Sequence, residues 1–197
     1  MLMHIEEKYS NYKTLSNEKI NEEDFKEKYP SFIFMYTFIS EHGGKIFEKG
    51  MFQFFSFQNA FKWTKLISHE YFAEFKNQLF CFAITWQGCI IAVDKNNQSI
   101  HLFDPATCEY FALEDTSIKN FLQDEFIEIE DEIIYPEDFN NSLSYLKIEN
   151  LNSEKSIGHK VSLFLAGEDS FENLEVIDTE VMWDLQIQIA EGINEIP

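Results

Sequence analysis

Few residues of this chain have the type and spacing that catalysis needs. Three cysteines, Cys81, Cys89 and Cys108, could each supply a thiolate, but all of them lie in apolar runs. Burial in such runs raises the pKa of a thiol and makes it unreactive, so we expect small buried hydrophobic side chains. Their odd number and the lack of a CxxC pair argue against disulfide bonds and a thiolate zinc site. Ser162 lies outside any GxSxG motif and lacks the context of a serine nucleophile.

Acid–base pairs are equally sparse. His69 and Glu70 are adjacent in a predicted loop, but a lone pair of this kind does not indicate an acid–base site. Asp94 and Asp104 flank His101, and a preformed pocket that held all three would indicate an enzyme. Their positions beside turn residues predict instead that they lie in turns and at strand edges. We therefore expect a protein that is not an enzyme.

The largest group of ionisable side chains is an acidic run at 124–138. Its carboxylates alternate with isoleucines, and no DxDxDG pattern supplies the ligand spacing of a calcium loop, so we predict no metal and no cofactor. A solvated helix face and a docking surface for a basic partner are the two remaining interpretations. Under the second interpretation, the partner-binding residues are Asp124, Glu125, Glu128, Glu130, Asp131, Glu132, Glu137 and Asp138.

The overall charge favours a basic protein as the partner. The 197 residues include 35 acidic and 15 basic side chains, a net charge of −20, and every basic residue other than histidine is lysine. Such a chain repels phosphate backbones and lacks the bidentate donor of arginine, which argues against nucleic acid and anionic membranes. The same charge would speed encounter with a basic protein. Solubility combined with AT-rich codon usage is the alternative explanation of the acidic excess.

Neither end of the chain nor its interior predicts a membrane segment. No run approaches ~18 apolar residues, and the first residues, MLMHIEEKYS, are polar and acidic. We therefore expect a cytoplasmic protein. Its 45% hydrophobic residues and 21 phenylalanines predict a sizeable core, and an exposed phenylalanine patch could support a homodimer.

The element that must position these side chains is a series of four short apolar segments at 79–113. Turn signals separate the segments at Gln87-Gly88, at 95–98 and at 104–107. This pattern predicts an antiparallel meander. We assign the chain to the α+β class, with a central, mostly antiparallel sheet (the meander plus a C-terminal strand) flanked by helices.

Upstream of the meander, the sequence predicts helices and one strand. A short peripheral helix is capped by Ser16 or Asn17, and a second helix begins at Pro30 and ends at Gly43-Gly44. His42, in the last turn of that second helix, is expected to contact the helix carbonyls. A strand is predicted at 45–57, followed by a helix that Ser56 caps and Trp63 anchors.

Downstream of the meander, Asp115 or Thr116 is predicted to cap a helix, and a second amphipathic helix covers 139–148. Alternating apolar residues at 161–165 predict a strand, and 173–177 a second short extended segment. Asp178 then caps a C-terminal helix, which Trp183 would pack onto the sheet.

The C-terminal block resembles the "GYKVPLFLGG-x-D-x-x-x-NLE-x-x-D-x-x-VYW" signature of bacterial immunity proteins of the SUKH (Smi/Knr-like) and type VI secretion type. His159, Ser162, Ala166 and Met182 replace the expected residues, while the matching positions are Gly158, Lys160, Val161, Leu163, Phe164, Leu165, Gly167, Asp169, Asn173, Leu174, Glu175, Asp178, Val181 and Trp183. Weaker similarity upstream, at 41–52 and 82–105, extends the resemblance to about residues 30–190.

This resemblance implies a small cytosolic α+β protein without catalytic residues that binds and neutralises a cognate toxin by protein–protein contact. Residues 30–197 would form a single immunity-type domain, preceded by a peripheral segment at 1–29. The charge suggests a basic toxin such as a nuclease, delivered by type VI secretion or by contact. A regulatory or scaffold module whose partner is not a toxin, as in fungal members of the same superfamily, is the alternative.

Overall fold

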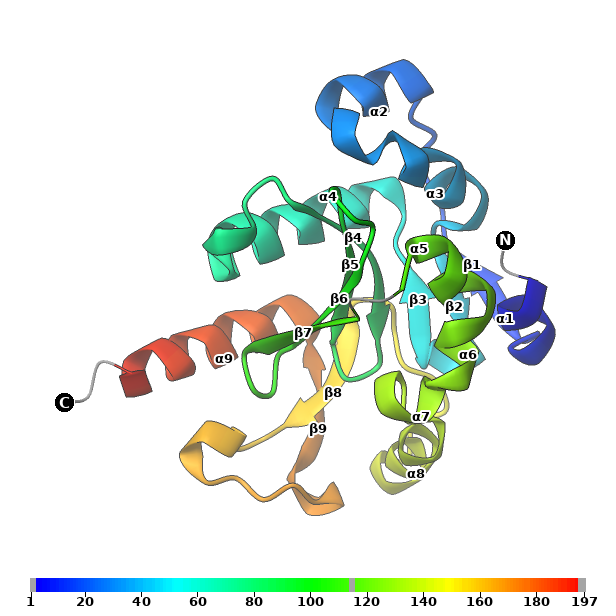
Figure 1. Cartoon of the computed structure of the whole chain (residues 1–197). Helices are drawn as coiled ribbons and strands as arrows, with labels where there is room; N and C mark the ends of the chain where they lie inside the picture. Colours follow the sequence, from blue (N-terminus) through cyan, green and yellow to red (C-terminus); the bar gives the residue numbers. More distant parts are fainter. Residues whose placement is uncertain (1–2, 114–115, 195–197) are drawn as a thin grey trace.

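A seven-stranded antiparallel sheet forms the centre of the molecule (Figure 1). The computed structural model describes residues 3–113 and 116–194. Each strand pairs with the next one along the chain in antiparallel orientation. Short turns join β2 to β3 and β4 through β7, whereas helical segments connect β1 to β2 and β3 to β4. The strands are β1 (Tyr12–Thr14), β2 (Lys45–Phe47), β3 (Phe52–Phe54), β4 (Leu79–Thr85), β5 (Ile90–Asp94), β6 (Ile100–Asp104) and β7 (Glu109–Leu113).

The predicted meander at 79–113 is confirmed as strands β4 to β7. Gly88 adopts φ +86°, a conformation that side chains disfavour, at the turn between β4 and β5. At the next two turns, the carboxylates of Asp94 and Asp104 accept hydrogen bonds from the backbone amides of Asn96 and Ala106, at 2.6 and 2.8 Å. Both aspartates are therefore turn residues, as predicted.

The single strand predicted at 45–57 is wrong, because this segment forms the two strands β2 and β3. A tight turn at 48–50 separates them, in which Glu48, Lys49 and Gly50 all have positive φ. Three successive residues in this region of φ and ψ reverse the chain, so the two halves pair with each other. Apolar residues lie on both sides of this turn, so the sequence pattern did not predict it.

The predicted peripheral segment at 1–29 contributes to the core in its described part. β1 is the edge strand of the sheet, and the side chains of Ile5, Tyr9 and Phe25 are buried. Phe25 packs between the aromatic rings of Phe57 and Phe80. These three apolar residues are isolated in an acidic and lysine-rich segment, so the sequence did not predict that they belong to the core.

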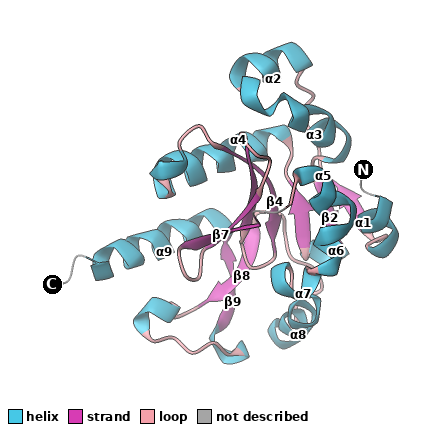
Figure 2. Cartoon of the chain, in the orientation of Figure 1, coloured by secondary structure: helices cyan, strands magenta, loops and turns pink. Residues whose placement is uncertain are grey.

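Nine α-helices surround the sheet in the described part of the chain (Figures 1 and 2). Figure 1 shows α4 and α9 on one side of the central strands and α5 to α8 on the other. They are α1 (Met3–Lys8), α2 (Glu22–Lys28), α3 (Tyr36–His42), α4 (Phe57–Lys65), α5 (Ile118–Asn120), α6 (Phe126–Glu128), α7 (Glu130–Ile133), α8 (Pro136–Leu146) and α9 (Thr179–Asn194). No helix in the described residues is both long and apolar enough to cross a membrane.

Among the helices predicted in the first half, α4 starts where predicted, whereas α2 and α3 start later than predicted. Asn21, and not Ser16 or Asn17, caps α2, because its side chain accepts a hydrogen bond from the backbone of Asp24. Ser56 caps α4 as predicted. A 3₁₀ turn from Pro30 precedes α3, which ends before Gly43.

His69 and Glu70 lie in a π-helical turn, Leu66–Tyr71, that extends α4, and not in the predicted loop. In the second half, Ser117, and not Thr116, caps α5, and Asp115 lies outside the described residues. α8 begins at Pro136, three residues before the predicted start, since proline is well placed in a first turn.

The C-terminal strand pairs in a separate hairpin and does not join the central sheet. β8 (Lys155–His159) pairs with β9 (Leu174–Asp178) in a two-stranded sheet (Figure 2). The strand predicted at 161–165 is wrong, because Leu163–Leu165 forms a 3₁₀ turn in the connection between β8 and β9. The extended segment predicted at 173–177 is confirmed as β9.

Helix α9 docks on the sheet as predicted. Asp178 caps it, accepting backbone hydrogen bonds from Glu180 and Val181 at 3.1 and 3.2 Å. Trp183 is fully buried, and its indole Nε1 donates a hydrogen bond to the carbonyl of Gly88 at 2.9 Å. This bond ties α9 to the β4–β5 turn.

Candidate functional site

A cavity of about 630 Å³ opens where the central sheet, α7, α8, the β8–β9 hairpin and α9 meet. The turns after β4 and β6 form its floor, and the α7–α8 corner and the hairpin form two walls. Its size lies within the range of about 300–1,000 Å³ that is typical of ligand sites. The lining residues come from distant parts of the chain, so the cavity exists only in the folded molecule.

Negative charge dominates this cavity. Its lining residues include five carboxylates, Asp104, Glu132, Asp138, Asp169 and Glu172. His159 is the only lining residue among those described with a basic side chain, and its Nε2 lies 3.3 Å from a carboxylate oxygen of Asp169. The other four carboxylates have no ion-pair partner among the described residues. The cavity therefore presents uncompensated negative charge.

Tyr135 lines the cavity between α7 and α8, next to its acidic residues. It lies between α7 and α8 with φ 45° and ψ 65°, a left-handed conformation that is uncommon for a bulky residue, and its side chain is 40% exposed. Burial, followed by the negative fields of Cys89, Asp104, Glu132 and Asp138, raises the pKa of Tyr135. The phenol therefore stays protonated at neutral pH, as a neutral ring and hydrogen-bond donor beside the carboxylates.

Exposed aromatic residues also gather at the cavity. Of the 21 phenylalanines, only Phe111 and Phe171 are exposed, at 51% and 39%, and both line it. The ring of Phe171 stacks on Tyr145 at a centroid distance of 5.9 Å. The rest of the phenylalanines are buried or partly buried, nearly all of them in or against the core, and they form no exposed patch.

One buried hydroxyl at the cavity lacks a partner. Ser142 lines the cavity from α8 and is 1% exposed, and its Oγ has no hydrogen-bond partner among the described residues. An unsatisfied buried polar group costs roughly 1–3 kcal/mol. Such groups are few in folded proteins, and each calls for an explanation.

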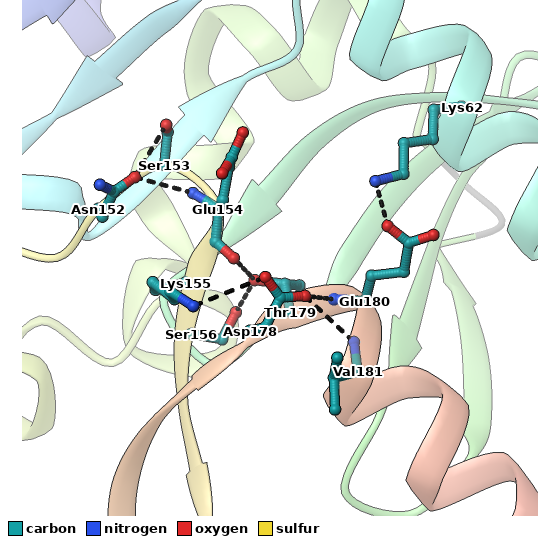
Figure 3. Close-up of polar contacts among 10 residues, drawn as sticks. All are labelled: Lys62, Asn152, Ser153, Glu154, Lys155, Ser156, Asp178, Thr179, Glu180 and Val181. Carbon is teal, nitrogen blue, oxygen red and sulfur yellow. Dashed lines mark hydrogen bonds and ion pairs between the residues drawn. The ribbon is translucent and has the colours of Figure 1, made fainter.

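The hairpin wall of the cavity is anchored to the rest of the molecule by polar contacts (Figure 3). Thr179 Oγ1 lies 2.8 Å from Ser156 Oγ and donates to the carbonyl of Glu154. Lys62 of α4 forms an ion pair with Glu180 in the first turn of α9. The Thr179 contacts fix the start of β8 to the start of α9, and the ion pair ties α9 to α4.

Residues of the C-terminal block at 158–183 build this wall. The side chain of Asn173 forms hydrogen bonds with both backbone groups of Val161 and with the carbonyl of Glu168. A Cβ at Gly167 would collide with the Val161 carbonyl oxygen, so only glycine fits there. Lys160 donates to the carbonyl of Glu172 at 2.7 Å. The pattern therefore specifies the shape of the hairpin connection.

The structure divides the eight predicted partner-binding residues. Glu132 and Asp138 line the cavity. Asp124 pairs with His4 at 2.9 Å, and Glu130 pairs with Lys8 at 2.6 Å and also accepts a hydrogen bond from Tyr9. These last two carboxylates hold helix α1 against the acidic segment.

The remaining four predicted residues lie outside the cavity lining. Glu128, Asp131 and Glu137 are exposed, and Glu125 is partly buried. Burial and the nearby charge of Glu128 raise the pKa of Glu125. The predicted partner-binding set did not include the lining residues Asp104, Asp169, Glu172, Phe111 and Phe171, and no local spacing connects them.

The other residues considered for catalysis are the three cysteines and the group of Asp94, His101 and Asp104. Cys81 is buried, whereas Cys89 and Cys108 are only half-buried, and burial raises the pKa of all three thiols, that of Cys108 to about 11. Asp104 lines the cavity, but Asp94 and His101 do not. The three residues that an acid–base site would need are thus not assembled there.

His42 contacts charged side chains from two other elements. Its Nδ1 lies 3.1 Å from Lys45 Nζ and 3.3 Å from a carboxylate oxygen of Glu6. Burial and the positive charge of Lys45 lower the pKa of His42, against the opposing effects of Glu6 and Glu41. This cluster joins α1, α3 and β2.

Comparison with known proteins gives a match at the level of fold. No protein-family model and no curated protein matches the chain. The crystal structure of Atu4351 from Agrobacterium tumefaciens is similar, with a TM-score of 0.61 and 16% sequence identity, over 95% of this chain and 89% of that chain. At this identity the similarity concerns the fold alone, and it agrees with the α+β architecture.

Proposed function

We propose that this chain is an immunity protein, which binds a basic bacterial toxin in the cytoplasm and neutralises it through protein–protein contact. The observation that carries the proposal is one acidic, aromatic-rimmed surface, in which the carboxylates of the α7–α8 corner meet the two exposed phenylalanines of the chain. Carboxylates attract a basic partner, and exposed aromatic side chains are typical of the centre of an interface. The resemblance of residues 158–183 to immunity proteins adds support from the sequence.

The charge of the whole chain suits such an inhibitor. With a net charge of −20 and no arginine, the chain would be steered toward a positively charged protein before any specific contact forms. A nuclease is a fitting target, because enzymes that bind nucleic acid carry a basic surface. Covering that surface would block access of the substrate.

Growth rescue tests this proposal. The gene beside that of an immunity protein is expected to encode a larger toxin, so its product is expressed in cells with and without this chain. We expect the wild-type chain to restore growth. A harmless neighbouring product, or a harmful one that this chain does not counteract, would contradict the proposal.

A charge-reversal variant tests the acidic surface separately. Its four lysine substitutions are at Glu128, Asp131, Glu132 and Glu137, and a matched control carries four at the exposed positions Glu18, Glu23, Glu27 and Glu74. Both variants change the net charge by the same amount. We expect rescue to fail only with the first variant, while both retain the circular dichroism spectrum of the wild type. Equal rescue by both variants would show that the acidic segment is not the docking surface.

A further inference from the structure

We infer that the cavity between α7, α8 and the β8–β9 hairpin is a socket for one basic side chain, arginine or lysine, of the partner protein. This inference rests on the proposed function and adds the location and chemistry of the central contact. It extends the binding surface from the acidic segment to the C-terminal hairpin, with Asp169 and Glu172 as additional contributors.

The charge of the cavity defines the occupant as a cation. Glu132 and Asp138 reach it from the α7–α8 corner, and Asp104 from the turn after β6. Within the cavity the nearby basic group, His159, already faces Asp169. A guanidinium or ammonium group would therefore meet carboxylates from several directions, and arginine in particular forms paired hydrogen bonds with them.

The aromatic residues define the occupant as a long side chain. Phe111, Tyr135 and Phe171 offer apolar area to its methylene stem and ring faces to its charged end. Their exposure, 51%, 40% and 39%, is what remains for a partner to cover. A small free cation would leave these rings exposed to water, whereas a long protein side chain would cover them.

Two unfavourable features lie where the occupant would bind. Tyr135 keeps a left-handed backbone conformation that costs roughly 1–3 kcal/mol, and the Ser142 hydroxyl is unsatisfied. Tyr135 lines the cavity together with Glu132 and Asp138. Ser142 lines the cavity from α8, and its buried Oγ has no hydrogen-bond partner among the described residues. Neither feature contributes to the core.

Neutral, nearly isosteric substitutions test the socket with the full-length chain. The socket variant is Glu132→Gln with Asp138→Asn, and the matched control is Glu23→Gln with Glu27→Gln, two exposed positions on α2, which removes the same charge outside both the cavity and the acidic segment. Affinity for the purified product of the neighbouring gene is measured by calorimetry at one salt concentration. We expect the socket variant to bind at least tenfold more weakly, and the control to stay within threefold of the wild type.

The outcomes separate the socket from the proposed function. Equal losses in both double variants would mean general charge attraction, and no loss in the socket variant would mean that the cavity stays empty in the complex; either result overturns the socket alone. A wild-type chain that neither binds nor rescues overturns the proposed function as well. Thermal unfolding of each variant, expected within a few degrees of the wild type, shows that a loss of affinity does not come from misfolding.

Discussion

Trp183 illustrates how one side chain fixes a wall of the cavity. Its ring is fully buried, stacks on Tyr71 at 5.6 Å and donates a hydrogen bond to the carbonyl of Gly88. The sequence predicted the packing role of this tryptophan, since a large aromatic residue on an amphipathic stripe anchors a helix. The acceptor was not predictable, because Gly88 is far from it in sequence.

Replacing Trp183 by phenylalanine should reduce the free energy of unfolding by about 2–4 kcal/mol. The smaller ring leaves a cavity, and the carbonyl of Gly88 loses its buried donor. Urea denaturation measures the change. Trp63→Phe, which removes a similar ring elsewhere in the core, serves as the control for volume alone. Equal losses in the two variants would mean that the hydrogen bond of Trp183 contributes little.

Tyr135 should show a conflict between stability and binding. Asparagine tolerates the left-handed conformation better than tyrosine, so Tyr135→Asn should leave the free energy of unfolding unchanged or raise it by up to about 1 kcal/mol. The same change removes the ring at the cavity mouth, and we expect weaker binding of the partner. Denaturation and calorimetry measure the two effects. A variant that is clearly less stable would show that the ring is a packing element.

At the scale of elements, the success of sequence reasoning depended on local signals. The meander was predictable because turn residues punctuate it at Gly88, after Asp94 and after Asp104. The strand predicted at 161–165 failed because the alternating residues Val161 and Leu165 are 48% and 58% exposed in a loop. Hydrogen bonds between Asn173 and Val161 shape that loop. The periodicity of apolar residues does not predict such bonds.

The cap of α9 should control the hairpin wall. Asp178→Ala removes the side-chain acceptor for Glu180 and Val181 and should cost about 1 kcal/mol of unfolding free energy. Asp178→Asn keeps an acceptor and should cost less, although it loses the charge that faces Lys155 at 3.6 Å. Thermal unfolding measures both variants. If asparagine is as harmful as alanine, the ion pair matters more than the cap.

The cluster that joins α1, α3 and β2 should make stability depend on pH. The pKa of His42 lies below its ordinary value of 6.5 in the folded chain, so the unfolded chain takes up a proton first as pH falls. The pKa of Glu6 is also lowered from 4.5, despite the opposing effect of burial, because Lys45 and His42 favour its charged form. Both shifts make the free energy of unfolding fall on acidification.

Denaturation of the wild type and of His42→Asn at several pH values checks this dependence. In the wild type, stability should begin to fall as pH drops through about 6.5, and to fall further as Glu6 takes up its proton in the folded chain at a pH below 4.5. In His42→Asn, the part of the decline above pH 5 should be smaller. Identical curves for the two proteins would exclude His42 as the cause.

At the scale of the whole molecule, the candidate site explains why the sequence revealed only part of it. Glu132 and Asp138 belong to a visible acidic run, but Asp104, Asp169 and Phe111 reach the cavity from three other segments. Their convergence depends on the docking of α9 and the hairpin, which no local pattern encodes. The fold class was predictable from the elements, whereas the geometry of the site required their arrangement.

Calorimetric titration of the purified neighbouring gene product with this chain tests the central claim most directly, because it asks whether an acidic protein works by binding a basic one. We predict a saturable complex whose affinity falls at least tenfold between about 50 and 500 mM salt, since complementary charges are screened over that range. Absence of a complex, or an affinity that does not change with salt, would contradict the account.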